Sequence, residues 1–583
     1  MAALPPGPRF ILAHLHYIVL PPLGVLSVHY IAGALFGLYI PPRAIVPLCV
    51  LSVPLFFFGS VAWEELRWKA AAASRGATLP PVARVRGDVI RAGENRFPRD
   101  FLFRLCEQYG NTFLVEIYFI KRLFTTEPDH VKAILATDFA SYEKGPSFRD
   151  QMRSLLGVGV FNADGELWKF HRSMARPFFS KDRISHFDIF DRHALDALDQ
   201  MKARMKEGYA FDWQDLVSRF TMDSATEFLF GKDVRSLSNG LPYPPTSDIA
   251  RTQTVKPDSD EFSAAFMEAQ TASAKRGRFQ SAWGLAEFWR DNVEMLKAAI
   301  DKFINPILVD ALERKAKKGQ DADEKVSEED TLLSQLLKVT DGYNIIHDEI
   351  VNILLAGRDT TACTLTFAVY RLAEQPEILQ RLREEVLSVV GPTRRPTYDD
   401  VRNMKYLRAV INETLRLYPP VPFNVRCAIK DTFLPSKTGD KPIFVPKGMR
   451  CLYSVFMMHR RKDLWGPDAL KFDPDRFLDE RVQKYLTPNP FIFVPFNAGP
   501  RICLGQQFAY NEASFMLIRL LQQVTAIQFV PEVAPESVIP PGYTDSPGSD
   551  GTDRVWMGSH LTMYAKGGLW VKMTVAQESE AEE

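Results

Sequence analysis

The chain has no excess charge of either sign, because 71 lysines and arginines balance 71 aspartates and glutamates among its 583 residues. This balance argues against nucleic acid as a partner, since nucleic-acid-binding chains carry an excess of basic residues. The chain also has only six cysteines, with no C-x-x-C spacing and no clustering. That scarcity argues against a disulfide framework and a zinc site, and it fits a reduced, cytosol-facing domain. There is no internal repeat, and the 46% apolar content suffices for one large core or two ordinary ones.

Acidic residues are absent from Phe10 to Trp63, and a single arginine and three histidines are the only basic interruptions there. Residues 23–40 and 44–63 are each long enough to span a bilayer, and Pro41–Arg43 separate them. The number of spans stays open, because prolines weaken the second segment as a straight helix and residues 10–20 also fit an interfacial position. A cleaved signal peptide is the alternative, but this apolar region is far too long and has no evident small-residue cleavage site.

Basic residues after the apolar region indicate which side of the membrane the rest of the chain occupies. Arg67 and Lys69 belong to this positive flank, and such flanks stay on the cytoplasmic side. The proline-rich stretch Thr78–Pro81 has the composition of a hinge. We therefore divide the chain into a membrane region, residues 1–78, and a cytosol-facing domain, residues 79–583.

The remainder of the chain has mostly helical spacing of apolar residues, with short stretches of strand pattern. Thr112–Tyr118 and Ile443–Val445 favour strands, and Pro535–Gly551 has the polar composition of a surface loop. The sequence therefore predicts a mainly α fold with small β-sheets. The predicted helices lie at Asp129–Leu135, Phe187–Met205, Trp213–Phe230, Phe262–Leu312 and Asp348–Val390.

One cysteine lies in a glycine-bounded loop, Phe496-Asn-Ala-Gly499-Pro-Arg501-Ile-Cys503-Leu-Gly505, before an apolar run at helical spacing. A cysteine just before a helix N-terminus meets backbone N–H groups and the positive end of the dipole, which favour the thiolate. Gly499 and Gly505 allow the backbone to approach a flat macrocycle. Arg501 can pair with an anionic group such as a haem propionate. The loop thus offers one thiolate to one iron, whereas the alternative is an ordinary buried cysteine.

A polar group, Ala356–Thr361, interrupts a long apolar helix that begins near His347. Threonine side chains in a helix bond back to the i−4 carbonyl and can open the turn, which leaves room for dioxygen and a water. Asp359 and Thr360 can then relay protons as general acid–base groups. The alternative is a helix with a polar kink and no chemical role.

Two further motifs place residues on one helix face. Glu413 and Arg416 are three apart in a helix that ends at a double proline, and Pro474–Phe477 follow later in the chain. Trp168 and Arg172 are four apart and share a face in the same way. Each motif alone is a weak signal of function. Their order along the chain, relative to the other motifs, makes both signals stronger.

Together these elements resemble the cytochrome P450 family of haem-thiolate monooxygenases, over about Pro80 to Met573, and most closely the fungal branch that oxidises alkanes and fatty acids. The resemblance implies that Cys503 is the axial ligand of haem b, iron protoporphyrin IX. It implies that Asp359 and Thr360 are the catalytic proton carriers. The other haem-binding residues that it implies are Phe496, Arg501, Trp168, Arg172 and Arg426. The buried structural network that it implies consists of Glu413, Arg416 and Arg476.

The function implied is insertion of one oxygen atom from O2 into a C–H bond of a lipophilic substrate: an alkane, fatty acid, alkylphenol or aromatic hydrocarbon. Because no flavin- or NADP-binding module follows Cys503, the electrons are expected from a separate membrane-bound NADPH–haemoprotein reductase, in the endoplasmic reticulum. The alternatives are a peroxide-driven or rearranging haem-thiolate enzyme and a non-catalytic membrane haem-binding protein. His171 and His459 are weaker candidates for the iron ligand, because no histidine motif surrounds them. The candidate pocket residues, by analogy of position, are Phe161, Leu355, Val421 and Phe423.

Overall fold

The computed structural model describes residues 4–86, 97–179, 187–252, 258–318, 331–340, 342–436 and 439–576. Helices dominate, and the strands form small sheets, which confirms the expected fold class. The helices are α1 (Pro6–Phe36), α2 (Pro42–Ser74), α4 (Asp100–Tyr109), α5 (Pro128–Lys132), α6 (Pro146–Leu156), α7 (Gly165–Ala175), α9 (Asp188–Lys206), α10 (Trp213–Phe230), α11 (Asp248–Thr252), α12 (Asp258–Phe279), α13 (Trp283–Ala286), α14 (Asn292–Lys318), α15 (Leu332–Val339), α16 (Tyr343–Glu374), α17 (Pro376–Val389), α18 (Tyr398–Asn403), α19 (Lys405–Leu417), α20 (Val455–Met458), α21 (Lys462–Trp465) and α22 (Gln506–Gln523). The strands are β1 (Val82–Arg84), β2 (Thr112–Ile117), β3 (Ile120–Thr125), β4 (Tyr142–Glu143), β5 (Phe211–Asp212), β6 (Phe423–Ala428), β7 (Thr432–Leu434), β8 (Ile443–Val445), β9 (Arg450–Ser454), β10 (Val524–Phe529), β11 (Met557–Ser559), β12 (Met563–Ala565) and β13 (Trp570–Val575).

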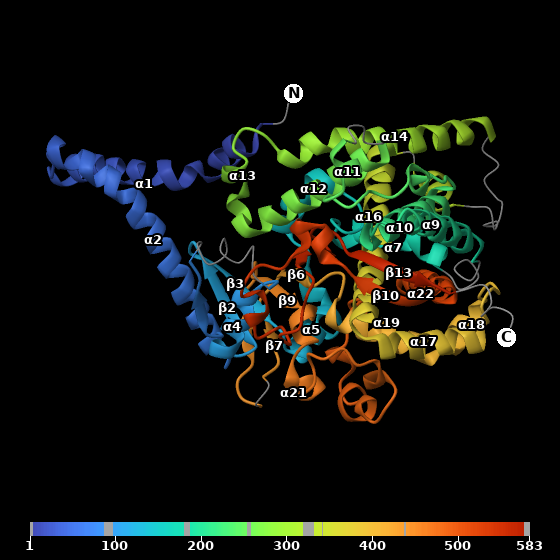
Figure 1. Ribbon diagram of the computed structural model, residues 1–583. Helices are drawn as coiled ribbons and strands as arrows, with labels where there is room; N and C mark the ends of the chain where they lie inside the picture. Colours follow the sequence, from blue (N-terminus) through green and yellow to red (C-terminus); the bar gives the residue numbers. More distant parts are fainter. Residues whose placement is uncertain are drawn as a thin grey trace.

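The long helix α16 runs through the middle of the helical part, with α10 and α22 packed against it (Figure 1). It is apolar on nearly all sides, as a helix surrounded by other elements must be. Close packing requires a small residue at Gly357, where a Cβ atom would lie 3.2 Å from the Cβ of Ala225 on α10. The polar group that follows Gly357 is therefore held in the centre of the domain.

Two predicted helices are broken in the structure. Phe262–Leu312 is divided into α12, α13 and α14, because Gln280 adopts a left-handed conformation and Asp291 accepts backbone N–H groups at the start of α14. Asp348–Val390 is divided at Gln375, since Pro376 has no N–H to continue the ladder. The segment Pro535–Gly551 is a loop with short 3-10 turns, as predicted, but part of it packs into the domain. Tyr543 in that segment is buried, with its ring 5.7 Å from the ring of Phe97.

The largest sheet has six strands in the order β1-β2-β3-β9-β6-β4 and lies beside α2 (Figure 1). Strands β2 and β3 form an antiparallel hairpin in which Val115 is opposite Arg122. Strand β3 then pairs in parallel with β9, with Leu123 opposite Cys451. This register brings segments more than 300 residues apart side by side at the edge of the candidate site.

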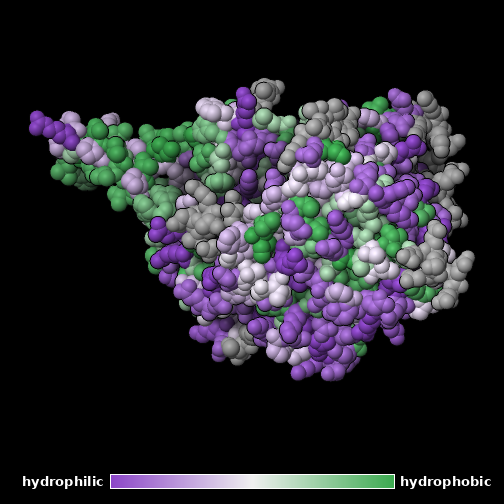
Figure 2. All heavy atoms as spheres, in the orientation of Figure 1, coloured by the Kyte–Doolittle hydropathy of each residue, from purple (hydrophilic) through white to green (hydrophobic). Residues whose placement is uncertain are grey.

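The two apolar helices α1 and α2 form a hairpin that projects from the domain (Figure 1), and Figure 2 shows hydrophobic side chains gathered on it. Both are long and apolar enough to cross a membrane. Helix α2 includes the predicted segment 44–63 and extends beyond both of its ends, whereas α1 begins well before the predicted segment 23–40 and ends at Phe36, inside it. The predicted interfacial stretch, residues 10–20, is a continuous part of α1, which contacts α2 through rings of Tyr17 and Phe56 6.0 Å apart.

Candidate active site

A cavity of about 510 Å³ lies between α16, the start of α22 and the six-stranded sheet. Its walls are mostly apolar, which suits a lipophilic molecule. All four of the pocket residues expected by analogy, Phe161, Leu355, Val421 and Phe423, line it.

Cys503 faces this cavity from the loop that precedes α22. The backbone N–H of Cys503 donates to the carbonyl oxygen of Phe496 at 3.0 Å, which closes the loop. The surrounding protein raises the pKa of the Cys503 thiol, whereas the backbone N–H of Gly505 and the charge of Arg172 act in the opposite direction. The side chain is nevertheless accessible from the cavity, so its sulfur can reach a ligand there.

The two loop glycines have different roles. Gly505 lines the cavity, in keeping with the close approach expected of it. Gly499 has a φ of +66°, and a Cβ atom there would lie 1.9 Å from the carbonyl oxygen of Leu135. The space beside Gly499 is therefore filled by another backbone segment, and this glycine packs the loop against the domain.

Two arginine side chains lie at the Cys503 loop. Arg501 donates to Asp164 at 2.9 Å, and its guanidinium carbon is 4.5 Å from the centre of the Trp168 ring. Arg172 donates to the carbonyl oxygen of Ile502 at 2.9 Å. The residues expected to bind a haem group thus all line one cavity, in which the structure brings together Cys503, Phe496, Arg501, Trp168, Arg172 and Arg426.

These residues fit a haem group, whose edge carries two carboxylates. Arg426 has a buried Nε atom with no hydrogen-bond partner, and so does Arg501. Lys144, which our sequence analysis missed, also lines the cavity, and burial beside Arg426 and Arg501 lowers its pKa well below the usual value. Such a cluster of cations is stabilised by bound anions. Lys144 directly follows the short strand β4, and no local motif could have identified it.

Thr360 lines the cavity, and its hydroxyl donates to the carbonyl oxygen of Ala356 at 2.7 Å. This is the expected i−4 bond, but α16 stays helical throughout, so the expected opening of the turn is absent. Asp359 points elsewhere: it accepts a hydrogen bond of 2.6 Å from Gln270 on α12 and forms an ion pair of 3.2 Å with Arg358. The two residues are adjacent in sequence, and only Thr360 is among the residues that line the cavity.

Glu512 on α22 is a buried acid that our sequence analysis did not single out. It is the only acidic residue in α22, which is the signal that could have identified it. Burial raises its pKa well above the usual value, and the side chain of Thr361 on α16 offsets that effect in part. A buried acid with a raised pKa therefore lies next to the polar group of α16.

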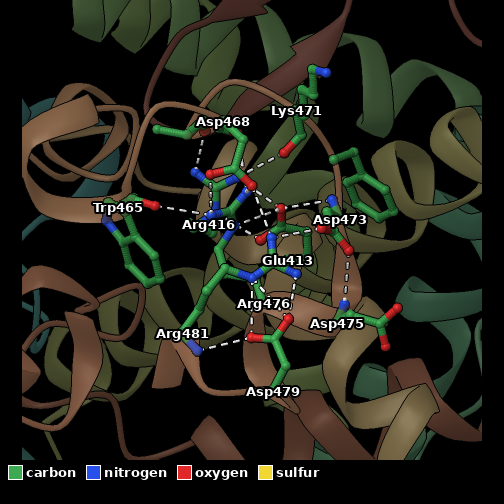
Figure 3. Close-up of polar contacts among 12 residues, drawn as sticks. Glu413, Arg416, Trp465, Asp468, Lys471, Asp473, Asp475, Arg476, Asp479 and Arg481 are labelled. Carbon is green, nitrogen blue, oxygen red and sulfur yellow. Dashed lines mark hydrogen bonds and ion pairs between the residues drawn. The ribbon is translucent and has the colours of Figure 1, made fainter. Parts of the chain in front are cut away.

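The network of Glu413, Arg416 and Arg476 is buried and does not line the cavity (Figure 3). Arg416 donates to both carboxylate oxygens of Glu413 and to the carbonyl oxygens of His459, Ala469 and Lys471. Arg476 contacts Glu413 at 3.5 Å and forms an ion pair of 2.9 Å with Asp468. The network therefore ties α19 to the segment that leads toward the cysteine loop, consistent with a structural role.

The two histidines considered as iron ligands lie outside the cavity lining. His171 is buried beside Glu349, with Nδ1 2.9 Å from a carboxylate oxygen. His459 accepts a hydrogen bond from the backbone N–H of Val494, and burial lowers its pKa to about 3. Both are core residues.

Comparison with known proteins agrees with this site. A model of the family described as cytochrome P450 matches residues 78–541. The chain is 37% identical to cytochrome P450 52A3-A of Candida maltosa over 464 residues, which cover 77% of this chain and 84% of that protein. It is 39% identical to cytochrome P450 52E1 of Candida apicola over 419 residues, covering 70% and 76% of the two chains. It is 37% identical to cytochrome P450 monooxygenase pvhE of Talaromyces variabilis over 459 residues, covering 75% and 80%.

The fold agrees with a crystal structure of a cytochrome P450 named CYP102L1, with a TM-score of 0.65 over 86% of this chain and all of that chain, at 22% identity. The chain belongs to the cytochrome P450 family. It is thus a monooxygenase of the class that uses haem iron, O2 and NADPH-derived electrons delivered by a reductase, and its relatives confirm the expected fungal branch.

Proposed function

We propose that this chain inserts one oxygen atom from O2 into a C–H bond of a lipophilic substrate, with electrons from a separate membrane-bound NADPH–haemoprotein reductase. The observation that carries the proposal is a mostly apolar cavity into which one thiol and several guanidinium groups point. Alkanes, fatty acids, alkylphenols and aromatic hydrocarbons all suit such walls.

Each group in the cavity has a proposed role in holding the haem. Cys503 would supply the thiolate for the iron, and Phe496, from the same loop, would help to hold the ring. The two propionates would be held by Arg501, Trp168, Arg172 and Arg426, with Lys144. When bound, the haem supplies the activation of O2, and a thiolate ligand favours cleavage of the O–O bond.

The proposed proton path uses residues of α16. The Thr360 hydroxyl donates to Ala356, so its oxygen retains lone pairs toward the cavity and can pass a proton to a molecule there. Asp359, which contacts Gln270 and Arg358, would deliver protons to Thr360, its neighbour on α16. The apolar walls exclude water and orient the substrate.

The test is the carbon monoxide difference spectrum of the full-length protein and its Cys503→Ser variant. The wild type should give the red-shifted band of a reduced haem-thiolate, and the variant should lose it. A band that survives the substitution places the ligand elsewhere. Substrate oxidation that requires NADPH and purified reductase excludes the peroxide-driven alternative, and absence of substrate-dependent NADPH use favours the haem-binding alternative.

For the membrane region, we propose that α1 and α2 cross the endoplasmic reticulum membrane as a hairpin, with the catalytic domain, residues 79–583, in the cytosol. The first turn of α1 supports this topology because it contacts the domain. The Gly7 N–H donates to the carbonyl oxygen of Phe288 at 2.9 Å, and Arg9 forms an ion pair of 3.0 Å with Asp150 on α6. Both ends of the hairpin therefore lie at the domain, which supports two spans with both ends on the same side of the membrane.

Protease protection tests this topology. An epitope before Leu4 should be digested on intact microsomes, and one inserted at Gly37–Ile40 should be protected. Protection of the first epitope instead would indicate a single span with the start of the chain in the lumen.

A further inference from the structure

The first turn of α1 packs closely against the segment that contains α13. The N–H of Gly7 donates to the carbonyl oxygen of Phe288, and a Cβ atom at Gly7 would lie 2.3 Å from the Phe288 ring. On the domain side, a Cβ atom at Gly284 of α13 would lie 2.6 Å from the carbonyl oxygen of Pro6. Each segment therefore has a glycine where the other one approaches, and neither position leaves room for a side chain.

One carboxylate on α6 joins the start of α1 to α13. Arg9 on α1 forms an ion pair of 3.0 Å with Asp150 on α6. The indole N–H of Trp283 on α13 donates to the other oxygen of the same carboxylate at 2.6 Å. The guanidinium carbon of Arg9 also lies 5.6 Å from the centre of the Trp283 ring. Three elements, α1, α6 and α13, therefore meet at Asp150.

A buried arginine on α12 holds the same two domain elements together. The guanidinium carbon of Arg276 lies 4.1 Å from the centre of the Trp283 ring. Arg276 donates to the hydroxyl of Ser154 at 3.1 Å and to the carbonyl oxygen of Gln151 at 3.3 Å, both on α6. The side-chain amide of Gln151 donates in turn to the carbonyl oxygen of Gln280 at 2.7 Å. Helix α6 is thus held to the end of α12 by buried groups and to α1 by more exposed ones.

The helices that meet here also form part of the cavity wall. Five of their residues line the cavity: Phe148, Gln151 and Met152 of α6, and Gly277 and Arg278 of α12. Asp150 and Gln151 are adjacent, so one turn of α6 contacts both the start of α1 and the cavity. A shift of α6 away from α12 would therefore open this part of the wall.

The second helix of the membrane hairpin is attached to the domain at a different place. Glu65 on α2 forms an ion pair of 2.7 Å with Lys121 on β3. The rings of Phe57 and Phe58 lie against the ring of Phe119 in the β2–β3 turn. Loss of the contact at Gly7 would therefore release α6 from α1 without detaching the membrane region from the domain.

We propose that the first turn of α1, Pro6–Arg9, acts as a clamp on the cavity wall. The clamp holds α6 against α12 and α13, and it thereby slows the entry and exit of ligands that are too bulky to pass without movement of α6. Release of the clamp would raise association and dissociation rates together, because it eases a conformational step and leaves the residues that line the cavity unchanged. The inference rests on the proposed topology, since the first turn must lie on the cytosolic side.

The experiment compares the wild type with Gly7→Val and Gly284→Val as full-length, haem-loaded proteins in lipid nanodiscs. The two substitutions place a side chain into the same contact from its two sides. The control is Gly24→Val, also on α1, where an added Cβ atom would meet no atom within 4 Å. Glycines are chosen instead of Arg9, because an ion pair as exposed as that of Arg9 with Asp150 contributes little.

Two measurements report on the clamp. Stopped-flow absorbance of the haem gives the association and dissociation rates of 1-dodecylimidazole, a bulky ligand, and of imidazole, a small one. Hydrogen–deuterium exchange, read by mass spectrometry, reports on the backbone of α6 and does not depend on ligand binding.

Both glycine variants should bind and release 1-dodecylimidazole about fivefold faster or more, the scale of one lost hydrogen bond. Imidazole rates should change less than about twofold, the scale of a surface substitution. The amides of α6 should exchange faster in both variants, and Gly24→Val should match the wild type throughout.

Unchanged ligand rates or unchanged α6 exchange in Gly7→Val would overturn the proposal. Equal acceleration of both ligands would also overturn it, because it would indicate general loosening of the protein. Gly7→Val decides the matter if Gly284→Val does not fold, since it leaves every residue of the domain unchanged.

Failure of the proposed function is distinguishable from failure of this inference. If the wild type lacks NADPH-dependent oxidation of every ligand, the monooxygenase proposal fails, whereas the exchange of α6 in Gly7→Val still reports on the clamp. An active enzyme whose epitope before Leu4 is digested, but whose α6 exchange does not respond to Gly7→Val, would overturn the clamp alone.

Discussion

Arg416 donates two hydrogen bonds of 2.7 Å to the carboxylate of Glu413, and neither side chain is exposed to solvent. The Glu413 carboxylate also accepts a hydrogen bond of 2.9 Å from the backbone N–H of Asp473. It therefore also fixes the segment that contains Arg476 (Figure 3). Because Glu413, Arg416 and Arg476 are all buried, removal of one of these charges leaves the others uncompensated.

Glu413→Gln should therefore destabilise the protein strongly. Breaking a buried ion pair typically costs about 3–5 kcal/mol, because one charge is left unpaired. We expect little folded haem protein, measured as the yield of the carbon monoxide band and the thermal midpoint. The matched control is Glu166→Gln, which breaks the exposed i, i+3 pair with Lys169 and should cost less than about 1 kcal/mol. Equal losses in both variants would contradict a special role for the buried network.

Thr360→Ala should bind haem normally but release peroxide instead of oxidising substrate efficiently. The Thr360 hydroxyl faces the cavity, whereas its backbone partner, Ala356, is unaffected by the substitution. Thr366→Ala is the matched control, because Thr366 makes the same i−4 bond of 2.7 Å from α16 but does not line the cavity. The measurement is the ratio of product to NADPH consumed. A similar ratio in both variants removes Thr360 from the proton path.

These residues illustrate what can be predicted from the sequence. The Cys503 loop and the polar group Ala356–Thr361 are each encoded by a short run of residues. Each could therefore be identified from the sequence without knowledge of the tertiary fold. Lys144 and Arg122, which also line the cavity, were missed because their environment depends on strand register. Arg122 approaches Arg450 only through the pairing of β3 with β9, which joins segments far apart in the chain. No local pattern encodes that pairing.

The helix boundaries show the same division. Pro376 is a local signal for the break between α16 and α17, because proline cannot continue the backbone ladder, although we predicted one helix there. The break between α12 and α14 depends instead on long-range contacts, since Asp291 is held by the hydroxyl of Ser154 as well as by its own helix start. Likewise, the contact of Gly7 with Phe288 that closes the membrane hairpin onto the domain joins two segments with no shared motif.

Glu512→Gln should make the protein more stable than the wild type as the pH rises. The folded-state pKa of Glu512 lies above its unfolded value, so the folded protein keeps a proton that the unfolded chain releases. The stability that Glu512 contributes is complete below the unfolded pKa and is lost as the pH rises toward the folded pKa. Glutamine mimics the protonated acid and does not titrate.

The difference in unfolding free energy between Glu512→Gln and the wild type should therefore grow by about 1.4 kcal/mol per pH unit above about pH 4.3, until the folded pKa is reached. The measurement is the thermal midpoint of both proteins between pH 5.5 and 7.5. All other groups titrate alike in the two proteins, so only Glu512 contributes to the difference. Parallel pH profiles would show that Glu512 is ionised in the folded protein.

Deletion of residues 1–78 should release the catalytic domain from the membrane, because both apolar helices are lost. Deletion of residues 1–41 should not, since α2 alone is long and apolar enough to span a bilayer. Alkaline extraction of the membranes distinguishes the two truncated proteins. We expect the β2–β3 turn to add a weaker membrane contact, because the Phe119 ring is 5.7 Å from Phe57 and 5.6 Å from Phe58 of α2 and is half-exposed. High salt or mild detergent should therefore release the protein that lacks residues 1–78. Resistance of that protein to alkaline extraction would place another apolar segment within the bilayer.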